Sequence, residues 1–286
     1  MGAPVVSLAR RIRLRRGVPV FGVWLLGLGL SACLAPPYET GPAAEIAASA
    51  QTFQQSVNGR SLHWVEVGPA TSLPVLMLHG TPGRWQAWGD YLNAPALAGL
   101  RRIAIDRPGF GNSAAGGVET SLQRQADWLA NLYADRGPLL VVGHSLGGSL
   151  ALRLLRDHPE LVRGVVLVAA SLDPAAEAPR WFNRVAQWPP VRWLLPEPLA
   201  RANAEVIALQ HELRALWADW TPDATPVVLI QGMEDRLVWP QTADFAEARW
   251  PSQTLQVQRL EQAGHFVLWD QPDIVIEAIV QLAMAR

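Results

Sequence analysis

The sequence predicts an α/β fold: a mostly parallel open sheet with helices on both faces and an inserted helical cap. From about residue 50 onward, short apolar runs alternate with stretches whose apolar residues recur at helical spacing. Most runs are apolar on both faces, which is typical of parallel strands covered by helices on both sides. The alternation stops once, between Ser171 and Pro226, where no strand pattern occurs. These observations predict one domain over residues 50–286, with a cap inserted at about 172–225.

The first predicted strand, residues 61–68, alternates apolar and polar residues, so we expect it at the outside of the sheet. The following strands are mainly aliphatic or β-branched, and we expect them inside the sheet. Their ranges are 74–80, 102–109, 139–145, 164–171, 226–232 and 254–260.

Three amphipathic stretches predict helices between or after these strands. The first covers residues 121–137 and has Ser121 as its candidate N-cap. The second begins at Ser145 and ends before Pro159, and the last covers residues 273–285. Their positions between strands predict crossover helices of a parallel sheet.

The predicted cap contains a further amphipathic helix, over residues 203–220. A helical projection of this stretch places six apolar residues on one face, namely Val206, Leu209, Leu213, Leu216, Trp217 and Trp220. Upstream of it, Trp181, Trp188 and Trp193 lie among prolines. A structureless loop of this length is uncommon inside a domain, so we interpret the stretch as helices over the sheet.

The N-terminal segment predicts export. Five arginines without an acidic residue precede an uncharged apolar run that is shorter than the roughly 20 residues of a membrane span. The run ends in Leu-Ser-Ala-Cys, which resembles the bacterial lipobox. We therefore expect a signal peptide over residues 1–32, lipidation of Cys33, a flexible tether over 33–49 and attachment to a membrane in the bacterial cell envelope. Leu34 weakly favours the outer membrane, and an uncleaved membrane anchor is the alternative.

Composition limits the partners and the redox chemistry. Acidic and basic residues nearly balance, with a formal net charge of −1, which gives no reason to expect a nucleic acid. The only cysteine in the chain cannot form an intramolecular disulfide. The six histidines are scattered and no nucleotide-binding fingerprint occurs, so we expect neither a metal nor a cofactor.

The most informative stretch is the strand that ends in Gly-His-Ser-Leu-Gly, residues 143–147. A serine hydroxyl is a poor nucleophile near neutral pH and needs a base to take its proton. A sharp turn from strand to helix lifts such a hydroxyl clear of the backbone and needs small neighbours, which the glycines provide. The N-terminus of the following helix favours negative charge that develops nearby. The pattern therefore predicts Ser145 as a nucleophile.

This stretch and its surroundings resemble the α/β-hydrolase superfamily, and the resemblance covers residues 50 to the end. It implies a triad in the order serine, acid, histidine. Asp235 follows a late strand and has the position of the acid, while His265 follows the last strand and has the position of the base. His265 would deprotonate Ser145, and Asp235 would orient the imidazole. Asp173 is the alternative acid, and Glu234 fits the motif less well.

The resemblance also implies an oxyanion hole made of two backbone N–H groups. One would come from Leu146, directly after the nucleophile. The other would come from Thr81, in the His-Gly-Thr-Pro-Gly turn of residues 79–83. We expect His79, His144 and Asp106 to hold loops rather than to react.

A serine at the elbow favours attack on an acyl carbon, because dehalogenases and epoxide hydrolases of this fold use aspartate there. We therefore expect a carboxylesterase-like enzyme that cleaves a small apolar ester or related acyl substrate. Four tryptophans follow the predicted site residues in sequence and two lie in the predicted cap, and we expect the six either to line an apolar pocket or to pack the cap on the core. They are Trp85, Trp88, Trp181, Trp217, Trp239 and Trp269.

Several alternatives use the same residues. A C–C bond hydrolase, a lactonase, a cofactor-free perhydrolase or an aminopeptidase needs the same nucleophile and base, and the 79–83 turn resembles that of proline iminopeptidases. A surface lipoprotein that binds a ligand without turnover is the alternative from another class. The sequence leaves the natural substrate, the mobility of the cap and the oligomeric state open.

Overall fold

The computed structural model describes residues 50–251 and 253–285. The predicted signal peptide 1–32, Cys33 and the tether 33–49 lie outside these residues. Within the described part of the chain, no helix is both long enough and apolar enough to cross a bilayer.

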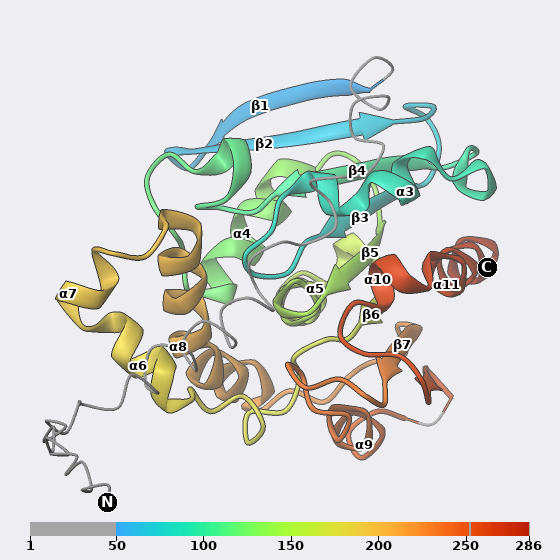
Figure 1. The fold of residues 1–286 in the computed structure, drawn as a ribbon. Helices are drawn as coiled ribbons and strands as arrows, with labels where there is room; N and C mark the ends of the chain where they lie inside the picture. The colour runs from blue at the N-terminus through green and yellow to red at the C-terminus, as the bar shows by residue number, and fades with distance from the viewer. Residues whose placement is uncertain (1–49, 252, 286) are drawn as a thin grey trace, which may run out of the picture. The chain divides into compact units, whose positions relative to one another are not determined.

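The described residues form an eight-stranded sheet in the order β1-β2-β4-β3-β5-β6-β7-β8 (Figure 1). β2 pairs antiparallel with both of its neighbours, β1 and β4. The six strands β4, β3, β5, β6, β7 and β8 run parallel to one another. The predicted α/β fold is therefore confirmed. The strands are β1 (Gln51–Val57), β2 (Arg60–Val67), β3 (Pro74–Leu78), β4 (Arg101–Asp106), β5 (Leu139–His144), β6 (Val162–Val168), β7 (Val227–Gly232) and β8 (Leu255–Leu260).

Helices connect the parallel strands, as their amphipathic patterns predict. The N-cap at Ser121 is confirmed, because its hydroxyl accepts a hydrogen bond from the backbone N–H of Arg124. The helices are α3 (Gly89–Asn93), α4 (Leu122–Tyr133), α5 (Leu146–Asp157), α6 (Trp181–Gln187), α7 (Pro189–Arg192), α8 (Glu197–Trp217), α9 (Thr242–Glu247), α10 (Val267–Asp270) and α11 (Pro272–Met284), with short 3-10 turns at Trp85–Trp88, Pro95–Leu97, Gly111–Ser113 and Pro159–Leu161.

Strand β1 is absent from the sequence prediction. Its sequence, QTFQQSV, has too few apolar residues to show a strand pattern, and most of its side chains are exposed. The Asn58-Gly59 pair that follows β1 is a sequence signal for a hairpin. Both residues adopt positive φ (48° and 79°), as a two-residue hairpin turn requires. The ring of Phe53 stacks on Trp64 of β2 at 5.4 Å, and this contact holds the hairpin on the sheet.

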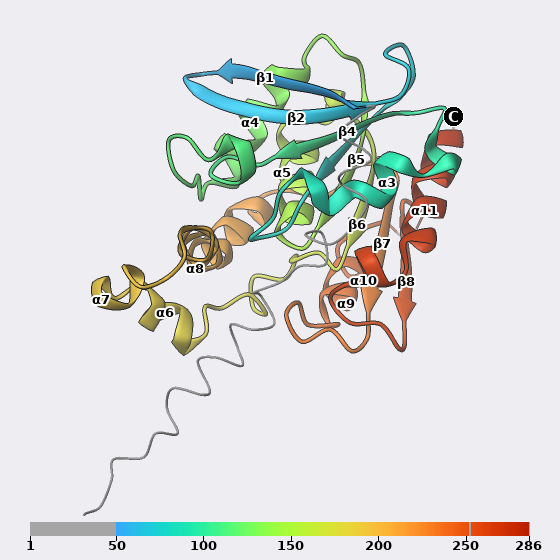
Figure 2. The ribbon, with the colours of Figure 1, turned by 45° about the horizontal axis from the view of Figure 1, so that its top comes forward.

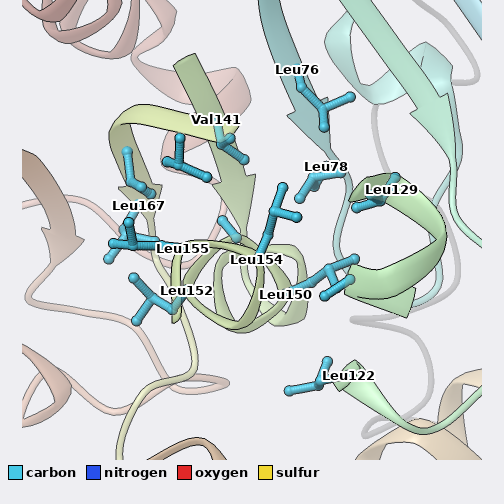
Figure 3. Packing of buried hydrophobic residues seen from close by; sticks show 14 of the residues in the cluster. Leu76, Leu78, Leu122, Leu129, Val141, Leu150, Leu152, Leu154, Leu155 and Leu167 are labelled. Atoms are coloured by element: carbon cyan, nitrogen blue, oxygen red, sulfur yellow. The ribbon is translucent and has the colours of Figure 1, made fainter. Parts of the chain in front are cut away.

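The sheet separates two apolar clusters, because successive residues of a strand point to opposite faces. Leu76 and Leu78 of β3 pack with α4, α5, α8 and α9 on one face. Val75 and Met77 pack with α3, α10 and α11 on the other. Figure 3 shows the leucines of α5 beside Leu78 and beside Val141 of β5. Both clusters together fix the parallel strands, whose carboxyl ends lie at one edge of the sheet.

Three helices occupy the interval between β6 and β7. α8 packs on the first cluster through Leu209, Leu213 and Leu216. Helices α6 and α7 lie outward of α8, away from the strands, in both Figure 1 and Figure 2. Neither of these two helices contains a buried residue.

Candidate active site

Ser145 lies at the turn between β5 and α5. Its backbone has φ 55° and ψ −125°, a conformation that is rare for residues other than glycine and that is found at strained functional positions. The turn is held by hydrogen bonds from the Ser145 N–H to Val168 O (3.0 Å) and from the Ser171 N–H to Ser145 O (3.3 Å). Ser145 is partly exposed, whereas residues 139–144 and 146–150 are buried. The fold therefore presents one hydroxyl at this edge of the sheet.

The glycines beside Ser145 are required by close backbone contacts. A Cβ atom at Gly143 would lie 2.4 Å from the carbonyl oxygen of Gly147. A Cβ atom at Gly147 would lie 2.2 Å from the carbonyl oxygen of Leu78, at the end of β3. Real Cβ atoms do not approach oxygen this closely, so α5 can pack against the ends of β3 and β5 only because these side chains are missing.

Asp235 and His265 form a hydrogen-bonded pair at the ends of β7 and β8. His265 Nδ1 lies 2.8 Å from Asp235 Oδ2, and both side chains are buried or nearly so. The other carboxylate oxygen, Oδ1, accepts the backbone N–H groups of Leu237 (2.8 Å) and Val238 (2.9 Å). Since a carboxylate accepts, Nδ1 carries the proton and Nε2 of the neutral ring is left as an acceptor.

The loop that carries His265 lies against the elbow. His144, the residue before Ser145, donates from Nε2 to the backbone oxygen of His265 at 3.1 Å. The two imidazole rings are 4.9 Å apart, and Trp269 contacts the His144 ring edge-on at 5.1 Å. The structure therefore brings Ser145, His265 and Asp235 to one edge of the sheet.

Loop 79–83 also lies against the elbow. A Cβ atom at Gly80 would be 3.0 Å from Ser145 Cβ, so this loop passes directly beside the serine. Nδ1 of His79 donates to Gly80 O (2.7 Å), and its Nε2 accepts the backbone N–H of Arg107 (2.9 Å). Burial, followed by the nearby Arg107 charge, holds the pKa of His79 well below its usual range. His79 thus fixes the loop, as expected, and the buried hydroxyl of Thr81 has no hydrogen-bond partner among the described residues.

His144 is also kept neutral by its surroundings. Burial, followed by the proximity of His265, lowers the pKa of His144 to about 3. A neutral His144 keeps its hydrogen bond to His265 O without placing a positive charge beside that ring.

We expect His144 to contribute a loss of stability as the pH falls from about 6.5 to about 3. In this range the unfolded chain protonates residue 144 and the folded chain does not, so the unfolded state binds more protons. This group alone would lower the free energy of unfolding by up to about 1.4 kcal/mol per pH unit. Urea unfolding at several pH values measures the slope. A His144→Gln variant keeps an N–H for His265 O but cannot be protonated, so its slope should be smaller; equal slopes would contradict the assignment.

Three other acidic side chains, Asp106, Asp173 and Glu177, have different surroundings. Asp106 is fully buried and accepts the backbone N–H of Trp85 (2.8 Å) and that of Asn112 (3.0 Å), so it holds loops together. Asp173, the alternative acid, accepts the Ala175 N–H at 2.8 Å within its own turn. Burial, together with the nearby Asp235 and Asp173 charges, raises the pKa of Glu177 to about 7, although a hydrogen bond to Ser171 opposes the shift.

The six tryptophans lie in different environments, and several of them take the packing role that the sequence left open. Trp85 and Trp88 are buried in the cluster beneath α3 and α11, where Trp88 contacts Tyr91. Trp217 packs against Trp220 and Trp250 in the other cluster. Trp181 and Trp239 are exposed, and only Trp269 contacts a residue of the elbow. An apolar side chain near a motif in sequence does not indicate which face of the sheet it packs on.

A surface hollow lies beside the Asp235 loop. It is lined by Met233, Glu234, Asp235, Arg236, Trp239, Pro240 and Gln241, and neither Ser145 nor His265 belongs to its lining. Among the described residues, no three His, Cys, Asp or Glu side chains are grouped so that they could hold a metal ion.

Sequence reasoning missed a buried ion pair that connects the cap to loop 79–83. Arg107 and Glu205 are almost fully buried, and two hydrogen bonds of 2.7 and 3.0 Å join them. The same guanidinium donates to His79 O (2.8 Å) and Gly80 O (3.0 Å). One signal was available, because Glu205 precedes Leu209 and Leu213 by helical steps and places a charge in an otherwise apolar stripe.

Comparison with known proteins defines the class. Residues 75–278 match the family model described as the alpha/beta hydrolase family. The chain belongs to this family.

Its relatives include an esterase. A pimeloyl-(acyl-carrier protein) methyl ester esterase from Aeromonas hydrophila is 28% identical over 250 residues, which cover 72% of this chain and 93% of that protein. The dihydrolipoyllysine-residue acetyltransferase component of an acetoin cleaving system from Pseudomonas putida is 34% identical over 118 residues, which cover 40% of this chain and 31% of that protein. The chain thus spans about a third of the length of this second relative and nearly all of the first.

Solved structures share the fold. Cfl2 from Burkholderia cenocepacia has a TM-score of 0.67 at 22% identity, covering 82% of this chain and 95% of that chain. The haloalkane dehalogenase DatA from Agrobacterium tumefaciens C58 has a TM-score of 0.64 at 17% identity, covering 82% of this chain and 96% of that chain. Relatives named as esterase, epoxide hydrolase and dehalogenase support a hydrolase.

Proposed function

We propose that the protein is a serine hydrolase that cleaves a carboxylic ester or related acyl substrate with an apolar group. The observation that carries this proposal is the Asp235–His265 hydrogen bond of 2.8 Å, made beside a serine in an elbow conformation. The bond leaves His265 Nε2 as an acceptor, which is the state that a general base needs.

In the proposed reaction, Ser145 Oγ attacks the acyl carbon while His265 Nε2 takes the hydroxyl proton. Asp235 orients the imidazole and stabilises its positive charge. The tetrahedral intermediate then collapses, the alcohol leaves with the proton from His265, and an acyl-enzyme forms on Ser145. Water, deprotonated by His265, hydrolyses this ester and restores the serine.

The negative oxygen of the intermediate would be bound by the backbone N–H groups of Leu146 and Thr81. The contact of Gly80 with the elbow and the position of Leu146 at the start of α5 support this assignment. The N-terminus of α5 adds a favourable field for the same charge. The unpartnered hydroxyl of Thr81 is a further donor that this loop offers.

We expect a fluorophosphonate to label the full chain once, on Ser145. The adduct would be located by mass spectrometry of the peptide that contains residues 139–150, and labelling should abolish hydrolysis of p-nitrophenyl esters. Lactone, amide, peracid and β-diketone substrates assayed in parallel would separate the alternatives with the same residues. If native protein is neither labelled nor able to cleave any ester of the panel, the proposal fails.

Lipidation of Cys33 and attachment in the bacterial cell envelope stay part of the proposal. Their support is the sequence of residues 10–33, in which a basic stretch, an apolar run and Leu-Ser-Ala-Cys follow one another.

A further inference from the structure

The cap carries a concentrated apolar surface. Among the described residues, eight large apolar side chains are exposed, and five of them lie within residues 181–194. We call these five the cap-tip patch: Trp181, Val185, Trp188, Trp193 and Leu194. Trp193 and Leu194 are 82% and 85% exposed. Exposed apolar residues scattered singly are ordinary, whereas a group such as this one marks an interaction surface.

The segment that carries the cap-tip patch is positively charged, and the exposed Glu197 that follows it is paired with Arg201. Residues 178–196 contain three arginines and no acidic residue, and Arg180, Arg184 and Arg192 are all exposed. Arg180 also donates to Arg236 O (2.9 Å) and lies over the ring of Trp239 (5.8 Å). Through this contact the apolar surface continues to the half-exposed Trp239, on the loop that carries Asp235.

We propose that the cap-tip patch docks on an anionic lipid surface. Tryptophan prefers the boundary between lipid and water, because its ring is apolar and its N–H is polar. Arginine binds phosphate groups with its planar fork, and exposed arginines beside an apolar surface are attracted to anionic lipids. Helices α6 and α7 lie away from the strands in Figures 1 and 2, and the five side chains of the patch are exposed.

Other occupants match the charge less well. In a two-fold contact with a second copy, the same arginines would face one another across the interface. The N-terminal residues 10–16 contain five arginines and would also repel the patch. The inference goes beyond the proposed function and does not depend on the role of Ser145.

The test uses the full chain in vesicles of phosphatidylcholine with and without phosphatidylglycerol, so that the N-terminal segment is the same throughout. Hydroxyl-radical labelling read by mass spectrometry reports the exposure of Trp188, Trp193 and Leu194. We expect these residues to be oxidised several-fold less when phosphatidylglycerol is present. Met284, which is 76% exposed near the C-terminus, is the internal reference and should not change.

Two variants make the result specific. In Arg184→Glu/Arg192→Glu, oxidation of Trp188 on phosphatidylglycerol vesicles should rise several-fold, because the attraction is reversed. Trp193→Ser/Leu194→Ser should raise it as well, whereas Met284→Ser is the matched control and should leave it unchanged. All of the substituted side chains are exposed, and circular dichroism would confirm folding. If the patch is protected equally in both lipids and in the charge-reversed variant, protein rather than lipid covers it. If the patch is oxidised equally with and without phosphatidylglycerol and in every variant, nothing covers it. Either result overturns the proposal.

Discussion

Replacing Ser145 by alanine is expected to lower kcat for ester hydrolysis by roughly 10⁴- to 10⁶-fold. In the proposed mechanism the variant loses the atom that forms the acyl-enzyme, while His265, Asp235 and loop 79–83 stay in place. Because the serine side chain is not buried and makes no cap bond to α5, the free energy of unfolding should change by less than about 1 kcal/mol. Steady-state hydrolysis of the best p-nitrophenyl ester, with urea unfolding in parallel, measures both quantities.

A matched control lies one turn further along the same helix. Ser149 donates to Ser171 O and contacts neither His265 nor loop 79–83 in any hydrogen bond of the described residues. Ser149→Ala should therefore lose about 1 kcal/mol of stability and keep its turnover within a few-fold. Turnover that survives in Ser145→Ala would exclude a serine mechanism and favour an Asp235- or water-based reaction.

Much of the fold and the positions of the main side chains could be predicted because their signals are local. The strands that surround the site are continuous apolar runs, and the elbow is a five-residue pattern. Asp235 and His265 follow directly after β7 and β8, and the carboxyl ends of parallel strands meet at one edge. Their 2.8 Å hydrogen bond is what this topology allows, although only the structure gives its geometry.

Other features could not be predicted because they depend on pairings across the chain. β1 lacks an apolar pattern and is recruited by the turn at Asn58 and by Phe53. The tryptophans differ in role because burial is decided by the layer they enter: Trp88 lies in the core, and Trp193 lies in solvent. The partner of Arg107 is 98 residues away in the sequence.

Replacing Glu205 by alanine is expected to lower the free energy of unfolding by about 3–5 kcal/mol. The substitution leaves the Arg107 guanidinium buried with no carboxylate, and the side-chain oxygen of Gln125 (3.1 Å) and two backbone oxygens cannot neutralise it. Urea unfolding of the full chain measures the loss. Glu247→Ala is the control, because it breaks an exposed pair with Arg259 and should cost no more than about 1 kcal/mol.

The same substitution should also reduce turnover, because Arg107 holds the carbonyl groups of His79 and Gly80 in the loop beside Ser145. A double variant, Arg107→Met/Glu205→Leu, removes both charges and should recover part of the stability. It should not recover turnover, since replacing Arg107 removes its two hydrogen bonds to loop 79–83. If the double variant recovers both stability and turnover, the ion pair serves stability alone. If Glu205→Ala loses no more unfolding free energy than Glu247→Ala, other groups compensate the buried charge of Arg107. Comparing the stability of the double variant with its turnover therefore shows whether the cap only packs on the sheet or also positions the loop beside the serine.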